Sequence, residues 1–230
     1  MSVIISSRCG IRCEDCHYLK DGVCSGKCCE ISKPFWGEQC PVKSCCESRH
    51  LQHCGQCPEF PCDLLKQFAY DPKQGDDGLR IQNCLAWREE SQKAIIDEAV
   101  QLLEQCNEIT VSSVTEDGFP RPCVLSKLGA DGIEAIYFST NTSSRKTPQF
   151  QANPKAGVCF ADGGDSVTLL GTVEIVTDQE KKNAVWRPWL ENHFPDGPEG
   201  KEFCLLKFIP KEMTFFLKGK FGTMPISISH

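Results

Sequence analysis

The chain has 230 residues, a formal net charge of −6, a sequence pI of about 5.4 and 17 cysteines. Such an acidic chain offers little basic surface to neutralise phosphates, so we expect no nucleic-acid partner. No run of the sequence approaches the roughly 20 apolar residues that span a membrane, and its start lacks the charged and apolar regions of a signal peptide. We therefore expect a cytoplasmic protein with no membrane partner.

Cysteine is concentrated near the start of the chain, where 12 of the 17 precede residue 63. This change in composition marks the main boundary between modules. We expect four segments: a Cys-rich module over 1–65, a loop and connecting helix over 66–108, a strand-rich domain over 109–217 and a C-terminal tail over 218–230.

The cysteines of the first module have spacings typical of metal sites. Two residues separate Cys13 from Cys16, and two separate Cys54 from Cys57. Each such spacing places two thiolates on one turn, and two turns complete the tetrahedron around zinc. Apart from cysteine, only 14 of the first 62 residues are apolar. So small a core cannot offset chain entropy without help, which a structural zinc ion supplies.

We predict two zinc sites, drawn from ten cysteines. The first uses Cys9, Cys13, Cys16, Cys24 and Cys28, and the second uses Cys40, Cys45, Cys54, Cys57 and Cys62. An iron–sulfur cluster is the alternative, although the compact C-x2-C-x2-C-x3-C-P run is absent. In that order, CGIRCEDC, CPVKSC and CGQCPEFPC also resemble a family of small Cys-rich prokaryotic domains thought to bind zinc, for which no activity is implied.

The connector begins with turn-forming residues between Asp71 and Gly78 and continues as an amphipathic pattern from Arg88 to Cys106. Its apolar residues fall on one stripe, formed by Ile95, Ile96, Ala99, Leu102, Leu103 and Cys106. This period predicts a helix that packs on the next domain, and we assign it no chemistry.

Short apolar runs separated by turn residues predict strands throughout the third segment. The predicted strands cover residues 109–115, 123–127, 133–139, 157–161, 166–176, 203–208 and 213–217. Because most of them follow one another as hairpins, with few helices between, they indicate a mainly β fold of the α+β class, built as a small antiparallel barrel.

The stretch FSTNTSSRKTPQFQANP, residues 138–154, predicts a phosphate site. Ser144, Arg145 and Lys146 supply a hydroxyl and two cations, and Thr147 followed by Pro148 is a typical start of a helix. Free N–H groups at a helix start, together with a guanidinium and an ammonium, suit a phosphate dianion. A solvated turn between a strand and a helix is the alternative interpretation.

The same stretch resembles the FMN-phosphate segment of the pyridoxamine 5′-phosphate oxidase superfamily, which carries Thr-Asn, Ser-Arg-Lys and Asn-Pro at this spacing. GFPRPCVLSKL, residues 118–128, is similar to the flavin-facing strand of that superfamily, and WRPWLENHFPDGP, residues 186–198, to its general-stress-protein branch. The resemblance implies an FMN-binding split barrel. By position it implies phosphate binding by Ser144, Arg145 and Lys146 beside Thr140 and Asn141, and ring contacts by Arg121, Cys123, Val124, Leu125 and Lys127.

The resemblance further implies an FMN-dependent oxidoreductase that acts on a small molecule, as a homodimer with FMN between the subunits. The alternative is an FMN-binding redox-sensing or electron-transfer protein with little turnover, whose Cys-rich module carries zinc or an iron–sulfur cluster. The C-terminal Arg and His residues that grip pyridoxal phosphate in the oxidase proper have no match in KGKFGTMPISISH, so we do not expect vitamin synthesis.

Overall fold

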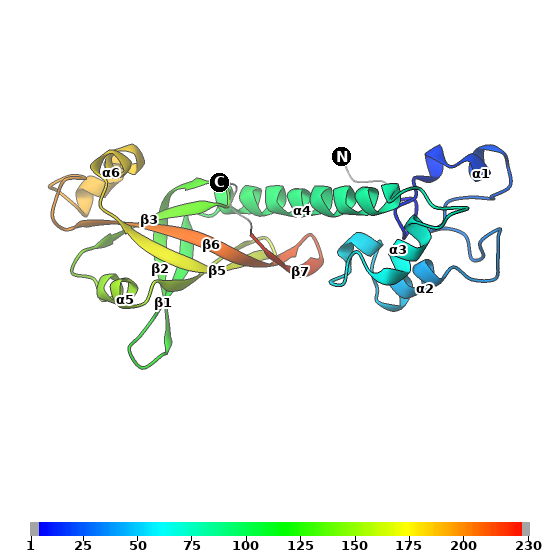
Figure 1. Ribbon diagram of the computed structural model, residues 1–230. Coiled ribbons are helices and arrows are strands. Elements are labelled where there is room, and N and C mark those ends of the chain that lie inside the picture. Colours follow the sequence, from blue (N-terminus) through cyan, green and yellow to red (C-terminus); the bar gives the residue numbers. More distant parts are fainter. Residues whose placement is uncertain (1–4, 227–230) are drawn as a thin grey trace. The chain divides into compact units, whose positions relative to one another are not determined.

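The computed structural model describes residues 5–226, which divide into two compact units after Ala94 (Figure 1). Helix α4, Leu79–Gln105, supplies residues to both units. Among the described residues, no helix combines the length and the apolar character needed to cross a membrane.

The first unit consists of short helices joined by turns and contains no strand within its described residues. Its elements are η1 (Cys13–Asp15), α1 (His17–Lys20), α2 (Pro41–Ser48), η2 (Cys54–Gln56) and α3 (Asp63–Ala69), followed by the first part of α4. The buried core is small, and four of its seven buried members are cysteines: Cys9, Val42, Cys46, Cys54, Leu65, Cys84 and Trp87. Here cysteine acts as a small apolar residue.

Helix α4 begins at Leu79, earlier than the sequence pattern predicted. Its first turns carry Ile81, Cys84 and Trp87, three residues apart in each step, and this stripe packs into the core of the first unit. Further along, Ala99, Leu102 and Leu103 pack into the core of the second unit. The helix that we predicted as a connector therefore contributes apolar side chains to the cores of both units, and not only to the core of the second.

The second unit is built around one antiparallel sheet. Its strands are β1 (Glu108–Val114), β2 (Pro120–Asp131), β3 (Ala135–Asn141), β4 (Lys155–Asp162), β5 (Asp165–Val176), β6 (Phe203–Leu217) and β7 (Lys220–Pro225). The strand order is β3-β2-β1-β4-β5-β6-β7, and β3 also pairs with β6, which closes a six-stranded barrel and leaves β7 outside the closure. The predicted mainly β barrel is confirmed.

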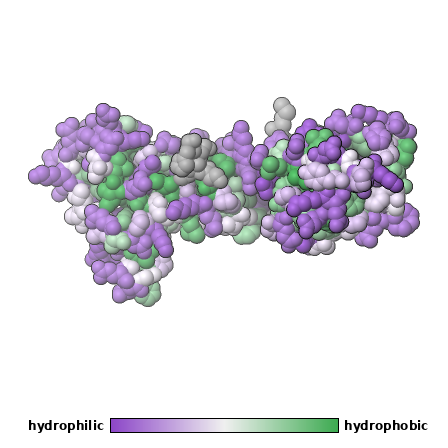
Figure 2. All heavy atoms as spheres, viewed as in Figure 1, coloured by the Kyte–Doolittle hydropathy of each residue, from purple (hydrophilic) through white to green (hydrophobic). Residues whose placement is uncertain are grey.

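Alternating side chains fill the barrel. Along β1, Ile109, Val111 and Ser113 are buried while the residues between them are half-buried. Helices α5 (Lys146–Ala152) and α6 (Gln179–Val185) and the 3-10 turn η3 (Pro188–Asn192) interrupt the strand sequence. Figure 2 shows apolar side chains reaching the surface of this unit between polar ones.

Strand β6 is one long strand where the sequence predicted two. Pro210, which cannot donate to a sheet, lies at a register shift opposite Gly171. A bulge tolerates proline because it leaves a residue outside the ladder, so the strand continues through it. After a two-residue turn at Lys218 and Gly219, both with positive φ, β7 forms in the segment that we had expected to be a tail.

Candidate functional site

A hollow of about 280 Å³ lies where the loop after β3 meets strands β1 and β2. Strand β2 contributes Arg121, Pro122 and Cys123, strand β1 contributes Ser113, and the loop contributes Ser144, Arg145 and Lys146. Five of the ten residues that we predicted for the cofactor therefore lie together: Arg121, Cys123, Ser144, Arg145 and Lys146.

Local hydrogen bonds fold the loop into the shape that presents these residues. The Asn141 side-chain oxygen accepts from the backbone N–H and the hydroxyl of Ser143, at 2.9 and 2.8 Å. The Asn141 carbonyl accepts from the Ser144 backbone N–H and the Thr147 hydroxyl, both at 2.9 Å. Asn141 thus orders the loop, as asparagine does in Asx turns.

The ammonium of Lys146 is held by two hydroxyl groups. Its Nζ donates to Ser144 Oγ at 2.9 Å and to Thr140 Oγ1 at 3.3 Å. A lysine has three N–H donors, so one remains for a ligand, and each accepting hydroxyl keeps its own hydrogen to donate. Ser144 lines the hollow, whereas Thr140 is buried behind it at the end of β3. The arrangement offers several donors to an anion.

Three cations border this hollow, and none of them is neutralised by a neighbour. Within residues 5–226, no carboxylate forms a salt bridge with Arg121, Arg145 or Lys146. Unpaired cations brought together repel one another, and a bound dianion removes that cost. The hollow is therefore suited to a phosphate group.

The start of helix α5 differs from the sequence prediction. The helix begins at Lys146, and its N-cap is Arg145, whose side chain makes no capping bond. Thr147 lies inside the first turn, and its hydroxyl donates back to the Asn141 carbonyl instead of capping the helix. The predicted helix start at Thr147 and Pro148 was therefore too late in the chain, and the Thr147 hydroxyl bonds back to the loop as a hydroxyl inside a first turn can.

A second and larger hollow, of about 710 Å³, adjoins the first at Ser113, which lines both. Its walls come from the outward face of β1, β4 and β5 and from the segment around Pro154. Leu170 in this wall is 52% exposed, and the neighbouring strand β2 presents Val124, which is 62% exposed. A polar pocket for an anion thus opens beside an apolar trough.

The remaining predicted residues lie outside the smaller hollow. Val124 points to solvent, and Leu125 packs partly against the barrel core. The Lys127 ammonium donates to the carbonyls of Leu103 and Glu104 in the last turn of α4. Burial lowers the pKa of Lys127 below its ordinary value.

Ser113 is the main residue that the sequence analysis missed. Its side chain is buried, and its hydroxyl donates to Gln149 Oε1 at 2.6 Å, which ties β1 to helix α5. A serine on the inward side of an otherwise apolar alternation, after Ile109 and Val111, is the pattern that could have identified it. Cys123, beside it in the hollow, has its pKa raised by burial.

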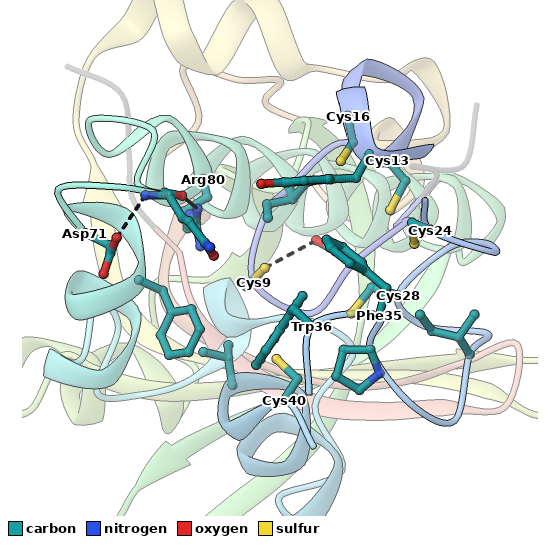
Figure 3. Close-up of a pocket in the computed structure, with 18 of the residues that line it drawn as sticks. Cys9, Cys13, Cys16, Cys24, Cys28, Phe35, Trp36, Cys40, Asp71 and Arg80 are labelled. Atoms are coloured by element: carbon teal, nitrogen blue, oxygen red, sulfur yellow. Dashed lines mark hydrogen bonds between the residues drawn. The ribbon is translucent and has the colours of Figure 1, made fainter. Parts of the chain in front are cut away.

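The first unit contains a separate pocket lined by cysteines, of about 400 Å³ (Figure 3). Six of the ten predicted metal ligands line it: Cys9, Cys13, Cys16, Cys24, Cys28 and Cys40. The other four, Cys45, Cys54, Cys57 and Cys62, do not. Between residues 5 and 226, no three His, Cys, Asp or Glu side chains converge closely enough to hold a metal ion, so the predicted zinc sites are not confirmed.

Cys54 lies instead in the buried core with a cysteine outside the predicted set. The sulfur atoms of Cys46 and Cys54 are 3.4 Å apart, and both residues are buried. This contact lowers the pKa of Cys46 and raises that of Cys54. The side chain of His53 is fully buried beside them, and burial lowers its pKa to about 4.

Comparison with known proteins concerns mainly the second unit. The family model of pyridoxamine 5′-phosphate oxidase matches residues 95–216. A solved structure from Clostridium acetobutylicum, a protein related to general stress protein 26 of Bacillus subtilis, is 27% identical with a TM-score of 0.54, over 58% of this chain and 95% of its own. A general stress protein 26 homologue from Jannaschia sp. CCS1 is 21% identical with a TM-score of 0.51, over 58% and 99%. No curated protein matches the chain.

Proposed function

Because the family model matches more than half of its residues, the chain belongs to the pyridoxamine 5′-phosphate oxidase family, and on this premise we propose that it is an FMN-dependent oxidoreductase. The observation that carries the proposal is the hollow bordered by Arg121, Arg145 and Lys146. A phosphate dianion with several acceptor oxygens matches both its charge and its donors.

The adjoining trough supports the assignment of FMN in particular. FMN joins a phosphate to a broad, largely apolar ring system, and the two hollows meet at Ser113. The outward face of β2 and the walls of the trough offer apolar surface at Val124 and Leu170. A free inorganic phosphate would use the first hollow alone, whereas FMN would use both.

Each residue of the site has a separate role in this proposal. Lys146 and Arg145 bind the phosphate, Ser144 donates to it, and Thr140 positions the Lys146 ammonium from behind. Arg121 lies on β2 and lines the same hollow, where it adds a third cation. Bound FMN supplies hydride or electron transfer to a small organic substrate, which the protein orients and shields from water.

The test compares FMN with riboflavin, which has the same ring but no phosphate. We expect Arg145→Ala combined with Lys146→Ala to weaken FMN binding about tenfold or more, because charge-assisted bonds to the phosphate are lost. Riboflavin binding should change little. The matched control is Lys181→Ala with Lys182→Ala, a pair of adjacent cations on α6 that do not line the hollow. Equal FMN affinity in both double variants would place the phosphate elsewhere.

We also propose that the protein is a homodimer with FMN at the subunit interface. The trough leaves apolar side chains such as Leu170 exposed in a single chain, and a second subunit would cover them. Leu170→Glu should therefore shift the protein toward monomer in analytical ultracentrifugation and weaken FMN binding in parallel. A wild-type protein that binds FMN as a monomer would contradict the proposal.

Turnover separates the oxidoreductase from its alternative, an FMN-binding redox-sensing or electron-transfer protein. Steady-state oxidation of NADH or NADPH with an added acceptor supports the oxidoreductase. Reduction of the bound flavin without turnover would support the alternative.

For the first unit, we propose that its thiolates bind a metal in the cytoplasm, and that the metal is zinc in preference to an iron–sulfur cluster.

A further inference from the structure

Two cysteine side chains are in contact within the core of the first unit. The sulfur atoms of Cys46 and Cys54 lie 3.4 Å apart, and both residues are buried. Cys46 belongs to helix α2, whereas Cys54 begins the 3-10 turn η2, so the contact joins two elements. Neither residue lines the pocket of Figure 3, and we call these two residues the core pair.

Thiols that line the pocket have oxygen atoms as partners instead of sulfur. Cys13 Sγ donates to the Ser6 carbonyl at 3.3 Å, and Cys24 Sγ donates to the Gly26 carbonyl at 3.2 Å. A thiol cannot form a disulfide through a contact with a carbonyl oxygen. The core pair differs from these two cysteines because its contact joins two sulfur atoms directly.

Backbone hydrogen bonds hold the core pair in place. At the end of α2 the Leu51 N–H donates to the Cys46 carbonyl at 2.9 Å, and His50 between them has a φ of 56°. Such an end turns the chain back along its helix. The Cys54 N–H then donates to the Arg8 carbonyl at 2.8 Å, and the Cys46 sulfur lies 3.9 Å from the same carbonyl oxygen. One carbonyl group thus lies against both cysteines.

We propose that the core pair is a site of reversible oxidation, at which a peroxide converts the two thiols into one disulfide. Disulfide sulfur atoms lie about 2.05 Å apart, so these two must approach by about 1.4 Å. Rotation about the side-chain bonds can supply so short a movement without displacing either element. In the reducing cytoplasm that we expect for this protein, a disulfide is transient and serves redox sensing or catalysis.

The oxidation consumes one molecule of hydrogen peroxide and releases two molecules of water. One sulfur attacks a peroxide oxygen, which breaks the O–O bond, forms a sulfenic acid and releases the first water. The second sulfur then attacks the sulfenic sulfur and displaces its hydroxyl group as the second water. Both thiol protons leave in these waters, and the peroxide takes up the two electrons that the sulfur atoms lose. A dithiol reductant reverses the reaction.

A disulfide in this position would join α2 to η2 across the core of the first unit. That core contains few buried apolar residues, so a covalent link adds support that packing does not provide. The inference is independent of the proposed flavin site and goes beyond the proposed metal binding. It withdraws Cys54 from the predicted metal ligands while the disulfide is formed, because only a free thiolate binds a metal.

The first experiment treats the reduced wild-type full chain with one equivalent of hydrogen peroxide and then blocks the remaining thiols in denaturant. Trypsin cuts after Arg49, between the two cysteines, so the disulfide joins peptides 44–49 and 50–66. Fragmentation in the mass spectrometer identifies the linked cysteine in each peptide. We expect the Cys46–Cys54 link to be about tenfold more abundant than any other pairing, because contact raises the effective concentration of one thiol at the other. Dithiothreitol should remove it.

The second experiment uses two matched pairs of variants. Cys45→Ala and Cys46→Ala change adjacent residues of α2, of which only Cys46 contacts Cys54. Cys54→Ala and Cys57→Ala likewise change one residue inside the core pair and one outside it. Oxidised Cys45→Ala and Cys57→Ala should keep the link, whereas Cys46→Ala and Cys54→Ala should lose it. In oxidised wild type, amide hydrogen exchange in α2 and η2 should slow, and in Cys46→Ala the same treatment should leave it unchanged.

Each outcome bears on this inference separately from the metal proposal. A wild-type chain whose core pair stays fully alkylatable after peroxide, or links to other cysteines instead, would overturn the inference. Alkylation of Cys54 that requires removal of zinc by a chelator would overturn it as well and retain metal binding. The expected link in a chain without bound metal would support the inference and overturn the metal proposal. If Cys46→Ala fails to fold, the peptide map of the wild-type chain still decides.

Discussion

Thr140 accepts a hydrogen bond from Lys146, with Oγ1 and Nζ 3.3 Å apart, and so fixes the ammonium from the buried side of the hollow. Thr140 is 7% exposed and belongs to β3, the strand that closes the barrel against β6. The position of the loop cation is therefore set by the barrel itself. A flexible lysine held in this way loses less conformational entropy when a phosphate binds.

Thr140→Val keeps the shape of the side chain and removes its hydroxyl. We expect FMN affinity to fall several-fold, about 0.5–1.5 kcal/mol, because one hydrogen bond that holds Lys146 is lost. The affinity for riboflavin, which has no phosphate, should stay the same. Isothermal titration calorimetry with the two ligands measures the ratio.

The control for this change is Thr177→Val, at an exposed threonine after β5. It should leave both affinities unchanged. If Thr140→Val lowered riboflavin and FMN affinity equally, the hydroxyl would support the fold of the barrel instead of the phosphate site.

The phosphate segment could be predicted from the sequence because its information is local. Ser144, Arg145 and Lys146 are adjacent in the chain, so they share one loop in any fold that ends a strand before them. The roles of Ser113 and Thr140 depend on which strands meet, and the register of β1 and β3 is set by the closed barrel. Spacing alone does not contain that information.

The family resemblance implies that Lys127 contacts the flavin ring, whereas the structure places its side chain at the end of helix α4. Its ammonium donates to the carbonyls of Leu103 and Glu104, which are among the last carbonyls of α4 and lack partners within the helix. A cation there also meets the negative end of the helix dipole. We expect Lys127→Met to lower the free energy of unfolding by about 1–2 kcal/mol in urea titrations.

Lys181→Met, on the exposed side of α6, is the control and should lower the free energy of unfolding by less than about 0.5 kcal/mol. The same Lys127→Met protein also tests the proposed contact with the flavin ring. A shift in the reduction potential of bound FMN would support that contact. An unchanged potential with reduced stability would assign Lys127 to the helix end alone.

The prediction of the fold succeeded where apolar residues recur with a clear period. It failed where contacts between distant residues determine where a strand ends or which cysteines lie together. Strands β1, β3 and β5 were predicted within a few residues because apolar residues alternate clearly along them. Pro210 was a reasonable strand break on local grounds, but the bulge opposite Gly171 lets β6 continue through it. In the first unit the spacing of the cysteines indicated pairs, and only the folded chain shows that Cys40 joins the earlier group.

Tyr137 gives the barrel a specific dependence on alkaline pH. Burial, a 2.9 Å hydrogen bond to Asp131 Oδ2 and nearby negative charge raise its pKa from 10.0 to about 12. Since the unfolded state releases this proton first, stability from Tyr137 is complete below pH 10 and is lost as pH rises toward 12. Urea unfolding should show a shallower loss over this range for Tyr137→Phe than for wild type.

Asp131→Asn is the companion variant for Tyr137. It removes the negative charge but keeps an acceptor oxygen, so the pKa of Tyr137 should fall toward its ordinary value. Ultraviolet titration of tyrosinate absorbance in the folded protein measures this directly. Identical titration curves in wild type, Asp131→Asn and Tyr137→Phe would contradict the assignment.

In the turn between β6 and β7, a substitution can test the cost of a left-handed backbone conformation alone, because an added side chain would meet no neighbouring atom. Lys218 and Gly219 have φ values of 49° and 77°, as in the two-residue turns that match the twist of a hairpin. A Cβ added at Gly219 would meet nothing within 4 Å, so the cost of Gly219→Ala comes only from its left-handed backbone. We expect a loss of about 1 kcal/mol in the free energy of unfolding.

Two further glycines provide controls, one with a smaller expected loss of stability and one with a larger. Gly37 also has open space around its Cβ position but no positive φ, so Gly37→Ala should leave stability unchanged or slightly higher. At Gly171 an added Cβ would lie 2.1 Å from the Ile209 carbonyl oxygen, so Gly171→Ala should destabilise the barrel more than Gly219→Ala does. Because backbone contacts at the bulge cannot move as a flexible side chain can, that loss should exceed about 2 kcal/mol. If Gly219→Ala proved as harmless as Gly37→Ala, the hairpin would use another turn, and β7 would not pair with β6 in the register found here.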